Sequence, residues 1–539
     1  EIARLAIQDA VPGHRRGLTH TAILASLGRA GGGDDARMAF HAEGAGDGPA
    51  VRQYATAAAR RASALGAHRE AAAQYERALR FAADGEPGAL ARLYDGFAYE
   101  AGLLGRWPDA VDAREQALAR WRRAGDDLRA GDSWRCLASA LAAVSRGQDA
   151  LAAARGALGL LEPLGPTTEL AWAYAVLAAL QMAHYEHTQA IELARRAQDV
   201  AGPLDLTEVL SHALNTEACS LQATGGDWAA PMGRALDIAR SGRNDVVTGR
   251  AYVNFFANYV ADRDFAPAEQ YFADGVAWCD DHDLSSLAAF IRTERASMLM
   301  RTGRWDEAVA VADDLLRRGG PAPGIRLGPL SALGTIRARR GDEGVWTALN
   351  EAVIHADGSG EPQWIVPVRL ARAEAHWLAG DQAAAAREAE QADDQAADCG
   401  HWDRGAIAVW LRRTGSDRPL RGPFAPPYAR ELDGDGRAAA RLWLDLGCRY
   451  DAALALLLAS PDEDAPDEGA LREAQQLLTG LGATAAVRRV RQAMRTLGIR
   501  SIPVGPRTAT RAHPLGLTRR EQEVLALIAA GRTNAQIAQ

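Results

Sequence analysis

The sequence predicts an all-α protein: a superhelical solenoid of helical hairpins, followed by a linker and a partial helix-turn-helix domain. Three observations predict this fold class. A short motif recurs about every 40 residues over most of the 539-residue chain. Small apolar residues at helical spacing fill the intervals between the copies. A segment with prolines and no apolar periodicity then precedes two last helix starts near the C-terminus.

The recurring motif is a small turn, a bulky or polar pair, and an alanine-rich helix. Seven alanines that follow the turns lie 38 to 40 residues apart, at positions 71, 110, 150, 190, 230, 268 and 308. A period in the range of roughly 34 to 47 residues is typical of helical-hairpin solenoids. The copies span 65–79, 104–118, 145–158, 183–197, 225–239, 262–272, 302–316, 379–392 and 447–459.

Partner helices are expected between the copies, for example over 89–104 and 170–183. Each unit is then two antiparallel helices, and neighbouring hairpins must stack because one hairpin cannot bury its apolar face alone. The array resembles tetratricopeptide repeats (TPRs), whose second helix has a small residue near its start. It departs from that family because its units are longer, and because the stretch 341–378 matches the motif poorly.

Five aromatic residues occupy a similar place in their repeats: Trp107, Tyr185, Trp228, Phe265 and Trp305. Equivalent placement indicates packing between hairpins. The alternative is a ladder of aromatic rings that stacks on a ligand.

Composition excludes several classes of activity. The chain contains no lysine, so it cannot hold a P-loop phosphate site or form a Schiff base. It has no apolar run of membrane-spanning length and no export signal, and its cysteines form no CxxC pair, so we expect a cytoplasmic protein with reduced thiols. The cysteines are at 136, 219, 279, 399 and 448.

No catalytic, metal-binding or cofactor-binding residue is predicted. The hydrolase and dinucleotide motifs are missing. His184 and His187 are three residues apart, but no third ligand is near them in the sequence. The acidic run 279–283 around His282 could suit a metal, yet it falls where a helix should end, which favours solvated carboxylates.

Charge is distributed unevenly. The net charge is -8, but the segment 485–539 has ten arginines against two glutamates. A basic end on an acidic body suits a polyanion-binding tail, whereas solvated arginines near a linker are the plain alternative. The arginines are at 488, 489, 491, 495, 500, 507, 511, 519, 520 and 532.

Residues 498–516 are predicted to be a flexible linker, and a helix is predicted after Leu517. Thr518 is a suitable N-cap and Glu521 completes a capping box. The apolar positions Val524, Leu525 and Ile528 form the buried stripe of a small domain, and Gly531 ends the helix.

A second helix is predicted from Thr533, with Gln536 as its capping-box partner and Ile537 and Ala538 facing inward. Helix, glycine turn and helix together are the first part of a helix-turn-helix layout. The segment 517–539 resembles the start of the LuxR-type DNA-binding domain, whose pattern is LTxRExEVLxL followed by GxxNxxIA. The matching residues are Leu517, Thr518, Arg520, Glu521, Val524, Leu525, Gly531, Asn534, Ile537 and Ala538.

That resemblance implies that the chain stops inside a DNA-binding domain, before its recognition and dimerisation helices. Phosphate contacts are then expected from Thr533 and Asn534 at a helix N-terminus, with Arg519, Arg520 and Arg532 close by. The plain alternative is that Thr533 only caps a helix and the arginines only solvate a surface.

The N-terminal part resembles the large ATP-binding regulators of the LuxR family. The stretch FHAEGAGD at 40–47 and the repeats after it look like the junction between a nucleotide-switch (STAND) module and its TPR-like repeats. Residues 1–48 would be the last helices of that module and 49–497 the solenoid. The resemblance places the ATP site upstream of Glu1, and Glu1 itself is not a start methionine.

The sequence therefore predicts a non-enzymatic transcription regulator. Its solenoid would sense an inducer or a protein partner, the full-length protein would self-associate, and a complete C-terminal domain would bind promoter DNA. The alternative is a TPR-like scaffold for protein interactions without sequence-specific DNA binding.

Overall fold

The computed structural model describes residues 12–29, 34–82, 86–318, 323–457, 467–499, 517, 519–533 and 536. Within these ranges every regular element is a helix, which confirms the all-α, TPR-like fold class. Among the described helices, none combines the length and the apolar character that crossing a lipid bilayer requires.

The helices follow one another with short turns, mostly as hairpins. Their bounds are α2 (Gly13–Arg29), α3 (Asp35–Ala45), α4 (Gly48–Ala64), α5 (His68–Arg80), α6 (Pro87–Leu103), α7 (Trp107–Ala124), α8 (Asp127–Ala143), α9 (Gly147–Leu161), a 3₁₀ turn η1 (Glu162–Leu164), α10 (Thr168–Ala183), α11 (His187–Ala201), α12 (Thr207–Thr224), α13 (Ala229–Ser241), α14 (Asp245–Ala261), α15 (Phe265–Asp281), α16 (Ser285–Arg301), α17 (Trp305–Arg318), α18 (Pro323–Arg340), α19 (Val345–Ser359), α20 (Pro362–Ala379), α21 (Gln382–Asp394), α22 (His401–Thr414), α23 (Pro426–Leu432), α24 (Gly436–Asp445), α25 (Arg449–Leu457), α26 (Glu468–Gly480), α27 (Thr484–Thr496) and α29 (Arg519–Ala529).

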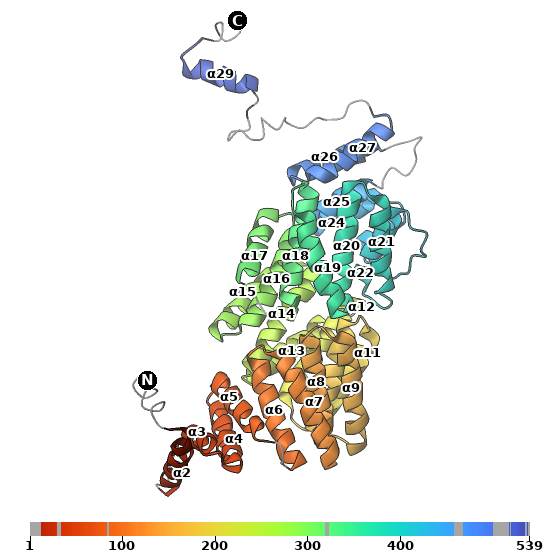
Figure 1. Cartoon of the computed structure of the whole chain (residues 1–539). Coiled ribbons are helices and arrows are strands. Elements are labelled where there is room, and N and C mark those ends of the chain that lie inside the picture. The colour runs from red at the N-terminus through yellow and green to blue at the C-terminus, as the bar shows by residue number, and fades with distance from the viewer. Residues whose placement is uncertain are drawn as a thin grey trace.

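The hairpins stack into two layers. Each even-numbered helix from α4 to α20 packs against the odd-numbered helix that follows it. From α8 to α22 each even-numbered helix also packs against the next even-numbered one. The even-numbered helices therefore form the inner layer of the superhelix and the odd-numbered ones its outer layer, and Figure 1 shows the resulting curved array.

The motif alanines seat the second helix of each hairpin. Ala71, Ala110, Ala150, Ala190, Ala268 and Ala308 are buried, as a small residue at a helix crossing should be. Ala230 is the exception, because it is exposed. The turn before α13 is longer and includes Gly225 and Gly226, so α13 begins later and Met232 takes the buried position.

The aromatic motif positions are less equivalent than the sequence indicated. Trp107, Phe265 and Trp305 each begin a helix, but Trp228 precedes α13 and Tyr185 lies in the turn before α11. Tyr185, Trp228 and Trp305 are buried, whereas Trp107 and Phe265 are half-buried. All five pack within hydrophobic clusters or at their edges, so packing is the interpretation that their environments favour.

The poorly matched stretch 341–378 still forms a hairpin layer. It contains α19 and most of α20, and α18 packs against both of them. The turn before α19 has two glycines in the left-handed region, Gly341 at φ +77° and Gly344 at φ +79°. This longer turn displaces α19 and breaks the sequence spacing without breaking the stack.

Most turns between paired helices place one residue in the left-handed region, and most use glycine there, as at Gly66, Gly105 and Gly303. Glycine is the default because it has no Cβ to clash. Three sister turns use another residue: Ser145 at φ +62°, Tyr185 at φ +64° and Arg263 at φ +63°. A side chain in this region costs roughly 1 to 2 kcal/mol, so something must hold it there.

The superhelix closes on itself. α12 lies beside α22 where the first and second halves of the array meet (Figure 1). Nδ1 of His401 is 3.0 Å from the carbonyl oxygen of Ala223, across 178 residues of sequence. A Cβ on Gly400 would lie 2.4 Å from the same oxygen, so only glycine allows this approach. A second junction brings Gly147 against the carbonyl of Ser359.

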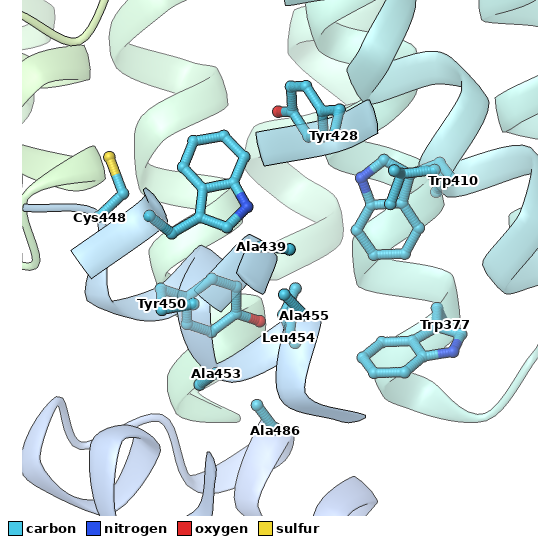
Figure 2. Close-up of a cluster of buried hydrophobic side chains, with 14 of the residues drawn as sticks. Trp377, Trp410, Tyr428, Ala439, Cys448, Tyr450, Ala453, Leu454, Ala455 and Ala486 are labelled. Atoms are coloured by element: carbon cyan, nitrogen blue, oxygen red, sulfur yellow. The ribbon is translucent and has the colours of Figure 1, made fainter. Parts of the chain in front are cut away.

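The largest hydrophobic cluster lies in the second half, and Tyr185 joins it from the first half. Figure 2 shows Trp377 and Trp410 on one side of this cluster, with Cys448 and Tyr450 on the other. The two indoles meet edge to face with ring centroids 5.8 Å apart. Burying several large aromatic rings stabilises the closed superhelix, because each fully buried large apolar side chain contributes about 1.5 to 3 kcal/mol.

Candidate functional site: an inner cavity and the C-terminal helix

A cavity of about 300 Å³ lies within the second half of the superhelix. Its wall is made by the inner helices α16, α18, α20 and α22, and residues of α23, α24 and α25 close its far end. Cavities of this size hold small organic ligands.

Two arginines of this wall have carboxylate partners. Arg339 donates two hydrogen bonds to Glu374, with Nε–Oε1 at 2.7 Å and Nη2–Oε2 at 3.0 Å, and both side chains are less than a tenth exposed. Its guanidinium also lies 3.8 Å from the ring centroid of Tyr450. Burial alone would lower the pKa of Arg339, but Glu374 and Tyr450 raise it above its ordinary value.

The second pair is formed by Arg413 of α22 and Glu431 of α23. Both side chains are buried, and the Arg413 guanidinium also faces the ring of Trp410 at 5.0 Å. Burial raises the pKa of Glu431, although Arg413 opposes that shift. These two ion pairs neutralise four of the charged groups on the cavity wall.

Two other arginines have no carboxylate partner within ion-pair distance among the described residues. Arg263 follows α14 and donates only to the carbonyl oxygens of Val260 and Ala261, while its guanidinium lies 4.3 Å from the ring centroid of Trp402. Arg301 ends α16, and its buried Nε has no hydrogen-bond partner. Repulsion from Arg263, followed by burial, lowers the pKa of Arg301, while Tyr428 and then Asp451 oppose that shift.

Three carboxyl groups on the same wall also lack an ion pair within the described part of the chain: Glu294, Asp403 and Asp451. Burial raises the pKa of Glu294, and Arg301 only partly offsets the shift. Asp403 faces the hydroxyl of Tyr185, whose pKa is raised first by burial and then by this carboxylate. The wall therefore has separate cationic and acidic groups that do not neutralise each other directly.

A smaller cavity of about 120 Å³ adjoins the first and shares Arg263, Glu294, Arg301 and Asp403 with it. It extends to Ala223 and Gly400, the residues of the closing junction. The charged wall thus stands between the cavity and the place where the superhelix closes.

Besides its charged groups and polar side chains such as Ser297, Ser331 and Thr335, the larger cavity has an apolar and aromatic part. Leu327, Val368 and Leu454 are buried side chains that line it. Trp364 and Trp410 add indole surface from α20 and α22. An apolar lining with a few converging polar groups is the usual composition of a small-molecule site.

The residues that the sequence singled out lie elsewhere. The predicted C-terminal helix is α29, and Gly531 ends it at φ +72°. The Arg532 N–H donates to the Leu527 carbonyl at 3.0 Å, which is the usual glycine-capped helix end. In the next turn the Thr533 N–H donates to Oε1 of Gln536 at 3.0 Å, the reciprocal arm of the predicted capping box.

Four of the predicted residues lie outside the described residues: Thr518, Asn534, Ile537 and Ala538. Arg519 begins α29, and of its side chain nothing is described. Consequently neither the first capping box nor the inward face of the second helix can be placed.

The expected core stripe of the small domain is largely uncovered. Leu525 and Ile528 are 45% and 55% exposed, whereas Leu517 and Val524 are half-buried. A core position needs a second surface against it, and the described residues supply none for these two side chains.

The predicted phosphate-contact residues that are described lie at the surface. Arg532 and Thr533 are exposed, as is Glu521 of the expected capping box. Arg520 is also exposed and forms an ion pair with Glu523, with a nitrogen–oxygen distance of 3.1 Å. Because Arg532 and Thr533 are exposed, a polyanion could reach them. Their exposure is compatible with both interpretations, phosphate contacts and a solvated surface.

The two histidines of the α10–α11 turn are buried. His187 has neither ring nitrogen hydrogen-bonded, and burial lowers its pKa to about 4. Burial also lowers the pKa of His184. His282 directly follows the last residue of α15, at the helix end that the sequence predicts. No cluster of three or more metal-binding side chains occurs in the described part of the chain.

Sequence reasoning missed the cavity, although one signal points to it. At the turn position where most repeats have glycine, the sequence has Tyr185 and Arg263. Both side chains reach the charged wall. A bulky residue at a turn position where the other repeats have glycine therefore indicates that its side chain has a role outside the turn, here at the charged wall of the cavity.

Comparison with known proteins gives a fold likeness only. No family model and no curated protein matches the chain. Solved TPR-containing structures match weakly. A STAND protein with a tetratricopeptide repeat sensor from Pyrococcus horikoshii is 12% identical with a TM-score of 0.35, over 64% of this chain and 52% of that one, so the match spans about half of that protein.

The two other comparisons are similarly distant. A chain of the APC/C hetero-tetramer Cut9-Hcn1 is 13% identical to this chain with a TM-score of 0.38, and the match covers 88% of this chain and 92% of that one. BtubC from P. vanneervenii is 20% identical with a TM-score of 0.33, over 43% of this chain and 93% of that one. Identities and scores this low do not carry function from any of these proteins to this chain.

Proposed function

We propose that the chain is a scaffold for protein interactions, and that the inner layer of its first half binds a segment of a partner protein. The observation that supports this is a ladder of half-buried polar and aromatic side chains across four successive inner helices. It consists of Arg135 on α8, Trp172 on α10, His212 on α12 and Arg250 on α14.

The first two steps of this ladder are ring contacts, and Arg250 joins α12 through a hydrogen bond to Thr216. The Arg135 guanidinium lies 5.8 Å from the ring of Trp172, and the ring of Trp172 lies 5.4 Å from that of His212. Arg250 donates to Oγ1 of Thr216 at 3.1 Å, and its Nη1 has no partner. The Arg250 side chain as a whole is half-buried, so a carboxylate from another protein that reached its accessible part would stabilise this surface.

The ladder suits a partner segment that combines acidic and apolar side chains. Arginine and tryptophan are the residues that most often dominate the binding energy of protein interfaces. In a solenoid, such a surface is continuous over many repeats and suits an extended or helical segment.

Affinity capture from the native host tests this proposal. Wild-type chain and the Arg250→Glu variant would be compared after both are shown to be folded by circular dichroism. A partner that is captured by the wild type and lost with the variant supports the scaffold, while identical captured sets would contradict it. The Arg317→Glu variant, at an exposed position of α17, is the matched control.

A second function is favoured by the C-terminal turn: a LuxR-type regulator, in which the solenoid is the sensor and a complete helix-turn-helix binds promoter DNA. The Gly531 cap that ends α29 and the Thr533–Gln536 hydrogen bond support this proposal, because both are expected in the turn of a helix-turn-helix. The residues shared with the LuxR-type pattern add to this. ATP binding by an upstream module and self-association are parts of the same proposal.

Binding to duplex DNA, measured at low and physiological salt, tests the second proposal. The 539-residue chain would be compared with one extended through a complete C-terminal helix-turn-helix domain. Sequence-specific binding by the extended chain alone supports the regulator. In the double variant Arg520→Gln with Arg532→Gln, this binding should be weaker and the dependence of the binding constant on salt concentration less steep. If the extended chain does not bind any DNA, the regulator proposal is contradicted and the scaffold function remains.

A further inference from the structure

We propose that the inner cavity binds a small organic carboxylate, with its carboxylate group between Arg263 and Arg301 and its apolar body against the aromatic wall. This site is separate from the ladder of Arg135, Trp172, His212 and Arg250, and goes beyond the scaffold function. The proposal rests on four observations about the cavity.

The first observation is the state of the two arginines. Neither has a carboxylate within ion-pair distance among the described residues, and the buried Nε of Arg301 has no hydrogen-bond partner. Ser331, which lines the same cavity, also has a buried hydroxyl without a partner. Because the two guanidiniums repel each other, a bound anion would relieve that repulsion.

The second observation is the backbone of Arg263. Its φ of +63° is left-handed, and most sister turns have glycine at this place. An arginine there is strained, and strained residues persist where the surrounding structure or a function holds them. The Arg263 side chain stacks on Trp402 and lines both cavities.

The third observation decides between kinds of anion. Glu294 and Asp403 lie on the same wall as the two arginines. Two carboxyl groups so close would repel a phosphate dianion more than a carboxylate monoanion. Burial raises the pKa of Glu294, so this carboxyl group is protonated more readily than an exposed glutamate and, when protonated, is able to donate a hydrogen bond to the ligand.

The fourth observation is the size and lining of the cavity. A volume of about 300 Å³ suits a small molecule rather than a polypeptide. The closing junction at Ala223 and Gly400 bounds the charged end. Trp364, Trp410 and apolar side chains such as Leu327 and Val368 bound the other part, so the ligand needs an apolar or aromatic body.

The test is a titration of the full chain with matched probes. Phenylacetate, indole-3-acetate, benzoate and hexanoate supply carboxylates, phenylacetamide supplies a neutral analogue, and phenyl phosphate supplies the dianion. Binding is measured by calorimetry and by tryptophan fluorescence. At least one carboxylate is expected to bind, and phenylacetamide and phenyl phosphate are each expected to bind at least about tenfold more weakly than the best carboxylate.

Variants locate the site. Arg301→Met and Arg263→Gly are each expected to weaken the best carboxylate at least about tenfold, and the double variant to abolish its binding. Arg304→Met, at an exposed arginine three residues beyond Arg301, is the control that keeps full affinity. Circular dichroism and thermal unfolding establish that each variant is folded.

Three outcomes would overturn the proposal. One is that no carboxylate binds to the folded wild type. The second is that phenylacetamide or phenyl phosphate binds as tightly as the best carboxylate. The third is that the folded double variant retains the wild-type affinity, which would place any binding elsewhere on the chain.

Discussion

One cavity holds two arginines with partners and two without, and the contrast separates structure from ligand recognition. Arg339 and Arg413 each meet a buried glutamate. Arg263 and Arg301 have no ion pair among the described residues: Arg263 donates to backbone carbonyls and lies against an indole, and Arg301 is repelled by Arg263 and attracted only from beyond ion-pair distance by Glu294 and Asp451. A buried charge is costly unless it is paired, so the first two arginines stabilise the fold, whereas the last two need something that the chain alone does not supply.

The largest expected effect comes from breaking a pair. Arg339→Met leaves the carboxylate of Glu374 buried without its partner, and should lower the free energy of unfolding by about 3 to 5 kcal/mol. Urea unfolding followed by circular dichroism measures this loss.

The double variant Arg339→Met with Glu374→Leu is the control for that experiment. It removes both charges and should recover most of the lost stability. Arg301→Met should cost far less than Arg339→Met, because it also removes the repulsion with Arg263. Equal losses from these two single variants would contradict the distinction between paired and unpaired arginines.

A smaller effect is expected from the unpaired acid. The raised pKa of Glu294 means that the folded state favours its protonated form. Its contribution to stability is therefore fully present below the ordinary pKa of a glutamate and is lost as the pH rises through the folded-state pKa. Glu294→Gln should thus stabilise the protein at pH 7, by about 1 to 3 kcal/mol, and have little effect at pH 4.

Thermal unfolding between pH 4 and pH 8 measures this difference. Glu307→Gln is the matched control, because Glu307 lies on the exposed surface of α17 and has its ion-pair partner in Arg304. A stability difference between wild type and Glu294→Gln that is the same at both ends of the pH range would count against a buried, titrating carboxyl group.

The closing junction bounds the unpaired arginines, and a single methyl group should disturb it. Gly400→Ala places a Cβ 2.4 Å from the carbonyl oxygen of Ala223, and we expect a loss of about 1 to 3 kcal/mol. Gly358→Ala is the control: this glycine lies in α19 with no atom within 4 Å of the new Cβ, and should gain about 0.5 to 1 kcal/mol. Chemical denaturation measures both, and equal effects would mean that the junction does not hold the fold closed.

The smallest effect concerns the strain at Arg263. Arg263→Ala keeps a Cβ in the left-handed region, whereas Arg263→Gly removes it. The glycine variant should therefore be the more stable of the two by about 1 kcal/mol. Gly66→Ala makes the reverse change in a sister turn with open space around it, and should cost a similar amount. Differential scanning calorimetry resolves these differences, and equal stability of the two Arg263 variants would show that the turn is unstrained.

Much of the fold could be predicted because the repeat is local. Ala110, Ala150 and Ala190 lie at constant spacing and are buried, since each seats one helix against its partner. The C-terminal helix and its Gly531 end could be predicted for the same reason, because capping depends on neighbouring residues. The regular spacing does not mark the buried position at Ala230, where a turn one residue longer than its sisters places Met232 at the helix crossing.

The cavity could not be predicted in the same way. Its charged wall combines Arg263 and Asp403, which are brought together only when the superhelix closes at His401 and Ala223. The curvature that closes a solenoid depends on small rotations summed over many hairpins, and no short motif encodes that sum. The local sequence indicates the cavity only through Tyr185 and Arg263, which stand at turn positions where most repeats have glycine.

The contact between His401 and Ala223 also limits how this array can change in evolution. An open solenoid tolerates the gain or loss of a repeat, because each hairpin contacts only its neighbours. Here, duplicating or deleting a hairpin between α12 and α22 would shift these two residues past each other and separate the walls of the cavity. Repeat number in this interval should therefore be fixed among descendants of this chain, while hairpins before α8 remain free to vary.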